Sequence, residues 1–249
     1  MFKKSYIIEI AVTDYASAAS AVQGGADRIE LCTALAEGGL TPSYALIETC
    51  KNDFNTPIFP IIRPRAGNFL YTDKEFEIIQ KDVLICKQLK CEGIVTGFLL
   101  KDGNIDKKRI SLITKLAFPM QVTFHRAFDR CVNPSQALED IIAAGCNRIL
   151  TSGQKTKAME GRELIKQLTE SAKGRIIIMP GSGVRKENIK ELAEKTCARE
   201  FHSSLSSFSK SEMNFINPAF ALAEGEYFHT AVNPDDVVEL RKALQDSAN

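Results

Sequence analysis

Residues 6–32 read YIIEIAVTDYASAASAVQGGADRIELC, and this stretch decides the fold class. Tyr6–Val12 and Asp27–Cys32 are short, largely apolar runs, which is typical of buried strands. Between them, Tyr15–Gln23 has the spacing of an amphipathic helix, and Gly25 stands where such a helix would end in a left-handed cap. The stretch therefore predicts a strand–helix–strand unit with two parallel strands.

The same alternation of strand and helix patterns continues to the end of the chain. The helix patterns separate six further strand-like runs: Pro57–Arg63, Gly93–Phe98, Met120–Arg126, Arg148–Ser152, Arg175–Pro180 and Arg199–Ser203. Eight strands with eight following helices in 249 residues match a (β/α)₈ barrel, so we predict an α/β, TIM-type barrel that forms a single domain over residues 1–249.

A doubly wound open sheet is the structural alternative. That fold usually carries a G-x-G-x-x-G turn after its first strand, whereas Val12 is followed here by Thr-Asp-Tyr. No nucleotide cofactor is therefore expected. Residues 204–233, after the last strand, predict a long irregular loop, which in a compact domain is usually a lid, a binding loop or a mobile segment.

Composition narrows the range of partners and compartments. A net charge of +1 gives no general attraction to nucleic acid or to a membrane surface, and no apolar stretch is long enough for a membrane span or a signal segment. The seven cysteines are odd in number and lack C-x-x-C spacing, so we expect reduced thiols and a cytoplasmic protein.

Polar side chains share one face of several predicted strands and come late in each run. In the second strand, Ile29 and Leu31 share one face, whereas Glu30 and Cys32 share the other. Large apolar residues should face the helices, so the polar set should point into the barrel near the carboxyl ends of the strands. This inward set is Glu9, Glu30, Cys32, Arg63, Arg65, Thr123, His125, Glu200 and His202.

Two interpretations of the inward set remain open. Pairing of Glu9 and Glu30 with Arg63 and Arg65 would make a structural ion-pair network, because buried charges need partners. Two histidines and a thiol are more than such a network requires, which favours a shared site for acid–base chemistry. The predicted catalytic residues are Glu9, Glu30, His125, Asp129 and His202.

Short turns after the later strands predict an anion site. Thr151-Ser-Gly153 and Gly181-Ser-Gly183 are small and polar, and the loops after the seventh and eighth strands are the usual phosphate site of barrels. Tight turns without a ligand are the alternative. Guanidinium groups would strengthen such a site. The predicted anion-binding residues are Arg63, Arg65, Arg126, Ser152, Gly181, Ser182, Gly183 and Ser203.

Several of these stretches together resemble the CutC copper homeostasis family. They are Gly24–Cys32, Glu37–Ser43, Ile62–Arg65 with Tyr71, Val122–Asp129, Ile149–Gln154 and Glu200–Ser203, spread over most of the chain. The resemblance implies a TIM-like barrel, a cytoplasmic location, a homodimer or larger homo-oligomer, and a role in copper handling.

The resemblance also implies where copper would bind. The family's copper proposal rests on cysteines at the ends of the first two strands, and Cys32 matches the second position. Ala11 stands at the first position, and Cu(I) prefers two or more soft sulfur ligands. Cys32 alone would leave such a Cu(I) site one sulfur ligand short.

Two functions follow from the sequence. The resemblance favours a copper homeostasis protein that binds or transfers Cu(I). The polar residues favour a barrel enzyme, of lyase, isomerase or aldolase type, acting on a small phosphorylated or carboxylated substrate.

Overall fold

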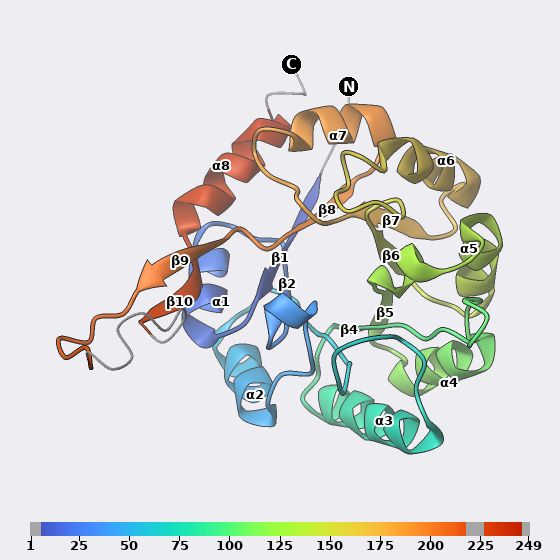
Figure 1. Ribbon diagram of the computed structural model, residues 1–249, viewed down its shortest axis with the longest axis horizontal. Helices are drawn as coiled ribbons and strands as arrows, with labels where there is room; N and C mark the ends of the chain where they lie inside the picture. The colour runs from blue at the N-terminus through green and yellow to red at the C-terminus, as the bar shows by residue number, and fades with distance from the viewer. Residues whose placement is uncertain (1–5, 218–226, 246–249) are drawn as a thin grey trace.

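The computed structural model describes residues 6–217 and 227–245, which form a ring of parallel strands surrounded by helices (Figure 1). The strands of the ring are β1 (Ile7–Val12), β2 (Arg28–Leu31), β3 (Ile58–Pro60), β4 (Gly93–Thr96), β5 (Gln121–Phe124), β6 (Arg148–Thr151), β7 (Ile177–Pro180) and β8 (Glu200–Ser203). The helices that follow them are α1 (Tyr15–Gln23), α2 (Tyr44–Asp53), α3 (Asp73–Gln88), α4 (Lys107–Ala117), α5 (Pro134–Ala143), α6 (Arg162–Ala172), α7 (Ile189–Thr196) and α8 (Pro234–Gln245). The predicted TIM-type barrel is confirmed.

Strand pairing follows the order expected for the barrel. The strands form two parallel sheets, ordered β3-β2-β1-β8 and β4-β5-β6-β7. A parallel bridge between Ile61 and Val95 joins β3 to β4 just beyond the end of β3, and β7 lies beside β8. The carboxyl ends of all eight strands therefore open at the same end of the barrel.

Local sequence signals begin and end the helices. Asp14 caps α1 by accepting a hydrogen bond from the Ser17 N–H, and Thr72 and Glu75 form a reciprocal capping box at the start of α3. Gly25 and Gly145 follow α1 and α5 with φ values of 85° and 86°, the left-handed conformation predicted for Gly25 from sequence. These signals fix where each helix turns back toward the next strand.

Alternation along the strands separates an outer core from the barrel interior. Ile10, Ile29, Phe124, Ile149 and Phe201 are fully buried in the main core between strands and helices. The interior contains a smaller apolar cluster of Cys32, Phe59, Ile61 and Val95, together with the charged side chains described below. Apolar residues thus cover the helix side, as the period-two pattern predicts.

The predicted irregular loop 204–233 is wrong in part. Ser206–Lys210 (β9) and Phe228–Val232 (β10) form an antiparallel hairpin that projects from the side of the barrel (Figure 1). Its exposed phenylalanines, Phe208 and Phe228, lack the burial that usually identifies a strand in sequence. Residues 218–226 of the predicted loop lie outside the described residues. Among the described residues, no helix is both long and apolar enough to cross a membrane.

Candidate functional site

A cavity of about 250 Å³ lies at the carboxyl ends of the strands. Seven of the predicted site residues line it: Glu30, His125, Arg126, Ser182, Gly183, His202 and Ser203. The remaining lining residues are Leu35, Gly38, Ile61, Phe69, Leu150 and Ser204. The structure therefore brings half of the fourteen predicted site residues together in the wall of one cavity. They come from β2, from β8 and from the residues that follow β5 and β7, as expected for the working end of a barrel.

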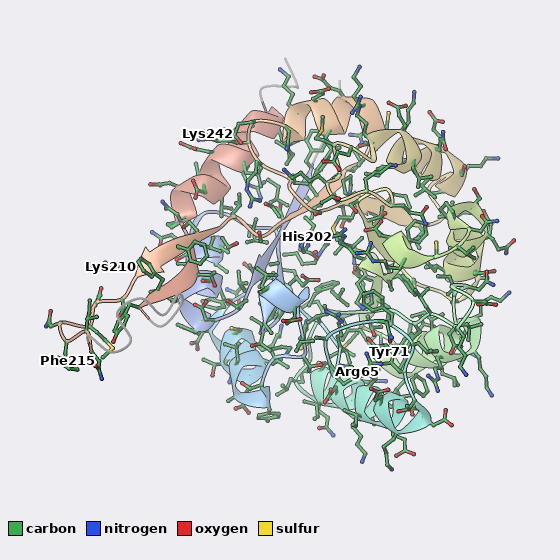
Figure 2. All side chains as sticks on the ribbon, in the orientation of Figure 1. Arg65, Tyr71, His202, Lys210, Phe215 and Lys242 are labelled. Carbon is green, nitrogen blue, oxygen red and sulfur yellow. The ribbon has the colours of Figure 1, made fainter. Side chains whose placement is uncertain are left out.

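On one side of the cavity, His202 lies between two carboxylates. Its Nδ1 is 2.7 Å from Glu9 Oε1, and its Nε2 is 3.8 Å from Glu30 Oε2. The β1–β8 pairing aligns Glu9 with His202, and both side chains point into the barrel (Figure 2 shows His202 near its centre). Glu9 is fully buried below His202 and supports it, rather than lining the cavity.

Two buried arginines compensate the carboxylates beneath the cavity. Arg28 donates to Glu9 through Nε at 2.5 Å and to Glu200 through Nη2 at 2.6 Å. Arg148 donates to the same Glu200 carboxylate at 3.0 Å. The predicted ion-pair partners Arg63 and Arg65 are thus wrong. Arg28 and Arg148 take their place because their strand positions also face inward.

The charges of this cluster shift the pKa values of the cavity residues. Burial, assisted by the Glu9 charge, raises the pKa of Glu30 to about 7. Burial opposes the charged form of His202, but the Glu30 and Glu9 carboxylates outweigh it and raise the His202 pKa. Burial likewise opposes ionisation of Glu9, yet Arg28 and His202 hold its pKa well below the usual range. Glu30 can therefore hold or release a proton near neutral pH, and His202 holds its proton more tightly than a free imidazole does.

His125 comes from the other side of the ring, at the end of β5. Its Nδ1 accepts a hydrogen bond from the Ala127 N–H at 3.2 Å, and its ring packs on Phe69 with centroids 4.7 Å apart. Burial and the nearby Arg63 guanidinium lower the pKa of His125 to about 3, so the imidazole is neutral. Its buried Nε2 has no hydrogen-bond partner in the described structure. This N–H is available to a ligand in the cavity.

Gly97 fits the His125 ring against β4. A Cβ at this position would lie 2.5 Å from His125 Nδ1, closer than van der Waals contact allows. The absence of a side chain at residue 97 therefore sets the position of the imidazole. Sequence reasoning missed this role, since the isolated glycine in Gly93–Phe98 was the only signal.

The turn after β7 offers backbone donors to an anion. Ser182 and Gly183 have φ values of 79° and 73°, and within residues 6–217 and 227–245 their backbone N–H groups have no acceptor. Consecutive N–H groups in such turns form concave anion sites, and positive φ in a non-glycine residue is typical of functional loops. The hydroxyl groups of Ser182 and Ser203 are already engaged in hydrogen bonds to the backbone. Ser182 Oγ donates to the Thr156 carbonyl, and Ser203 Oγ to the Val184 carbonyl.

Asp129 supports the site from behind and does not line the cavity. Its buried carboxylate accepts hydrogen bonds from the N–H groups of Ser152 and Gln154, from the Thr151 hydroxyl and from Arg126 Nε. The catalytic role predicted for Asp129 is therefore corrected to a positioning role, because every oxygen is already engaged. Ser152, whose hydroxyl lies 2.5 Å from the Lys155 carbonyl oxygen, belongs to the same support.

Within the part of the chain that the structure describes, Arg126 is the arginine that lines the cavity. Its Nε and Nη2 are held by Asp129 and Ser152, at 2.8 Å and 2.9 Å. Its Nη1 finds no acceptor in the described part of the chain and remains available to an anion. Gly181, in contrast, lies behind the wall, where a Cβ would lie 2.4 Å from Leu150 Cδ1.

The anion-binding roles predicted for Arg63 and Arg65 are not supported by their positions. Arg63 donates to the carbonyls of Glu37, Gly39 and Gly67, so it shapes the loop that carries Leu35 and Gly38. Arg65 pairs with Glu75 at 2.5 Å near α3, away from the barrel centre (Figure 2). β3 ends at Pro60, and strand alternation no longer determines side-chain direction beyond it.

Cys32 lies inside the barrel below the cavity, packed with Phe59 and Ile61. Its Sγ donates to the Val12 carbonyl at 3.4 Å, and burial next to Glu30 raises the pKa of the thiol well above its usual range. Thiolate, not thiol, binds metal ions. The neighbouring strand position is Ala11, so this environment does not fit a Cu(I) site with two sulfur ligands.

Comparisons with known proteins agree with the resemblance seen in the sequence. The CutC family model matches residues 6–207. The copper homeostasis protein cutC homolog of Homo sapiens is 44% identical over 217 residues, covering 87% of this chain and 80% of the relative. A family protein CutC of Parabacteroides distasonis is 48% identical over 212 residues, covering 85% of this chain and 87% of the relative.

A solved structure supports the same assignment. The crystal structure of a CutC protein from Streptococcus agalactiae superimposes with a TM-score of 0.76 at 30% sequence identity, covering 80% of this chain and 98% of that chain. The residues that the family model matches, 6–207, include β1 to β8 and every residue that lines the cavity. The chain belongs to the CutC family.

Proposed function

We propose that this protein is an enzyme that binds a small phosphorylated or carboxylated molecule at the barrel mouth and transfers protons to or from it. One observation carries the proposal. The titratable Glu30–His202 pair shares a cavity with the Nε2 of a neutral His125 and with the N–H groups of Ser182 and Gly183, none of which has a hydrogen-bond partner among the described residues. Acid–base residues beside an anion site are what a lyase or isomerase requires.

The proposed roles follow from the positions of these groups. The N–H groups of Ser182 and Gly183, with Arg126 Nη1, would hold the anionic group of the substrate. Glu30, with a pKa of about 7, and the neighbouring His202 would give a proton to, or take one from, the reacting atom. His125, neutral and fixed by the Ala127 N–H, would donate an Nε2 hydrogen bond to an oxygen that gains negative charge.

A role in copper homeostasis is the second candidate, because relatives such as the human protein carry this function in their names. A resident Cu(I) bound by Cys32 is not part of this proposal, since the donor set does not fit. We further propose a cytoplasmic location and a homodimer or larger homo-oligomer. The cysteines of the described residues form no disulfide, which supports a cytoplasmic location. The exposed apolar side chains of the β9–β10 hairpin support an oligomer, because they offer a surface to another chain.

Residue-resolved NMR tests the anion site directly. We expect inorganic phosphate to shift the backbone amide resonances of Ser182 and Gly183 in a saturable titration. Gly174 is the internal control, because it is also left-handed, with φ 75°, but lies in the turn before β7 at the other end of the barrel. Arg126→Gln should weaken phosphate binding by roughly tenfold, as expected for loss of a hydrogen bond to a charged group.

The same experiment can contradict the proposal. If neither phosphate nor small carboxylates shift Ser182 and Gly183 more than Gly174, the turn after β7 is not an anion site. If Arg126→Gln leaves the affinity for phosphate unchanged, the cavity does not bind anions in the proposed way. Glu30→Gln should leave phosphate affinity within about threefold and abolish turnover of any substrate found by screening.

A further inference from the structure

The Glu30 carboxylate and the His202 imidazole face each other without a direct hydrogen bond. Glu30 Oε2 and His202 Nε2 are 3.8 Å apart, which is too long for a hydrogen bond. A bridging water with two hydrogen bonds of about 2.8 Å would need about 4.4 Å between the two atoms. Zinc–ligand distances of about 2.0–2.2 Å place two ligand atoms about 3.4 Å apart at a tetrahedral angle, so a shift of about 0.4 Å would accommodate one metal ion.

The charges around this gap leave room for a cation. Glu9, Glu30 and Glu200 supply three negative charges, and the guanidinium groups of Arg28 and Arg148 supply two positive ones. One negative charge therefore remains inside the barrel when His202 is neutral. An uncompensated buried charge is costly, so the pair must hold either a proton or a metal ion.

The second carboxylate orients the histidine as metal sites require. Glu9 Oε1 contacts His202 Nδ1 at 2.7 Å, which leaves Nε2 directed at Glu30. Glu9 is itself fixed by Arg28. A carboxylate that binds the remote nitrogen of a metal-ligating histidine is the common supporting arrangement in metal sites. The ligand atoms of Glu9, Glu30 and His202 all lie within 4.8 Å of one another.

A separate observation points to a ligand in the same cavity. His125 is 4% exposed and lines the cavity with Glu30 and His202, yet its Nε2 has no partner in the described structure. A buried polar atom without a protein partner is free to bind a ligand or an ion. A metal ion at the Glu30–His202 gap would carry water or substrate oxygen in its open positions, and His125 Nε2 could bind such an oxygen.

We propose that the Glu30 carboxylate and His202 Nε2 form a binding site for a borderline divalent transition-metal ion, of which Zn²⁺ and Cu²⁺ are examples. The ion would compensate the one negative charge that Arg28 and Arg148 leave on the three carboxylates. Imidazole and carboxylate suit such ions better than Cu(I), so this site differs in chemistry and position from one built on Cys32. If the proposed enzymatic function holds, occupancy by the ion would block proton transfer by Glu30 and His202 and make the activity metal-sensitive.

Calorimetry with Zn²⁺ on the full chain without an affinity tag tests the site. All variants carry Cys197→Ser, because Cys197 is the exposed cysteine among the described residues. At pH 6.5, titrations in two buffers of different ionisation enthalpy give both affinity and proton release. We expect one Zn²⁺ per chain with release of about one proton. Glu30→Gln and His202→Gln should each weaken binding at least about tenfold, whereas Cys32→Ala should leave it unchanged.

Two results of the calorimetry would overturn the metal site. Absence of stoichiometric binding, or binding that survives Glu30→Gln but is lost in Cys32→Ala, would overturn it. Glu30→Gln is nearly isosteric, and an unchanged amide spectrum away from the cavity would show that it folds. Phosphate titrations of the same samples separate the two proposals. If Zn²⁺ does not bind but phosphate still shifts the Ser182 and Gly183 amides, only the metal site is overturned. If Zn²⁺ binds but phosphate shifts neither amide, only the anion site is overturned.

Discussion

The two sides of the barrel mouth hold their functional side chains in different ways. On the β1–β2–β8 side, His202 and Glu9 are held by other side chains, above all by Arg28, which is 172 positions away from Glu200. On the β5–β6 side, His125 and Asp129 bind backbone N–H groups of nearby residues, two to twenty-five positions away. One side depends on distant charges, and the other on local chain geometry.

This difference separates the chemistry of the two sides. A network of charged side chains can share and move protons, because its members change charge together. A neutral imidazole fixed by a backbone N–H keeps its position and charge, which suits a hydrogen-bond donor. The difference also predicts how each side responds to mutation, from the largest expected effect to the smallest.

Arg28→Ala should give the largest loss of stability. The substitution leaves Glu9 and Glu200 without their shared cation inside the barrel, and removal of one partner from a buried ion pair costs about 3–5 kcal/mol. Urea denaturation should show a lower midpoint with an unchanged slope. The matched control is Lys186→Ala, which removes the exposed pair with Glu239 and should leave the midpoint unchanged. Equal effects of both substitutions would contradict the special role of Arg28.

Asp129→Ala should have a smaller and more local effect. It removes the acceptor for the N–H groups of Ser152 and Gln154, and unsatisfied buried donors cost about 1–3 kcal/mol. Arg126 loses its Nε partner as well, so phosphate binding should weaken. Hydrogen exchange should be faster at residues 152–154 and unchanged at Glu9 and Arg28. Faster exchange on both sides of the mouth would show that the two sides are not independent.

The sequence predicts the barrel and the side-chain directions within its strands. Period-two alternation correctly directed Glu30, His125 and His202 into one cavity, because inward positions near strand ends converge in a closed barrel. The same rule applied to Arg28 in β2 and Arg148 in β6, but their pairing with Glu200 joins residues 172 and 52 positions apart. No local pattern identifies such partners.

Alternation fails where the strands end. β3 stops at Pro60, so Arg63 and Arg65 follow the loop and bind its carbonyls, not the carboxylates of the interior. Asp129 lies in a 3₁₀ turn, Arg126–Arg130, whose geometry directs its carboxylate back toward β6. Gly97 is recognisable only once the His125 ring is placed beside it. These residues depend on three-dimensional neighbours that a single sequence does not specify.

The pH dependence of the free energy of unfolding should also differ between the two sides of the mouth. This is the smallest of the three expected effects. The folded Glu30 carboxyl has a pKa of about 7 against an ordinary 4.5, so the folded state binds more protons over this range and stability falls as pH rises from about 4.5 to about 7. The raised pKa of His202 acts in the same direction.

His125, whose pKa is lowered to about 3 from 6.5, acts in the opposite direction. The unfolded state binds the extra proton, so stability falls as pH drops below about 6.5. Each group contributes at most about 1.4 kcal/mol per pH unit within its own range. Urea midpoints measured from pH 5 to 8 should therefore decline less between pH 6 and 7 in Glu30→Gln than in His125→Gln, because only the first substitution removes the contribution of the Glu30 proton. The contribution of His202 remains in both variants. An equal decline in both variants would show that Glu30 does not hold a proton in this range and would remove it from the proposed acid–base pair.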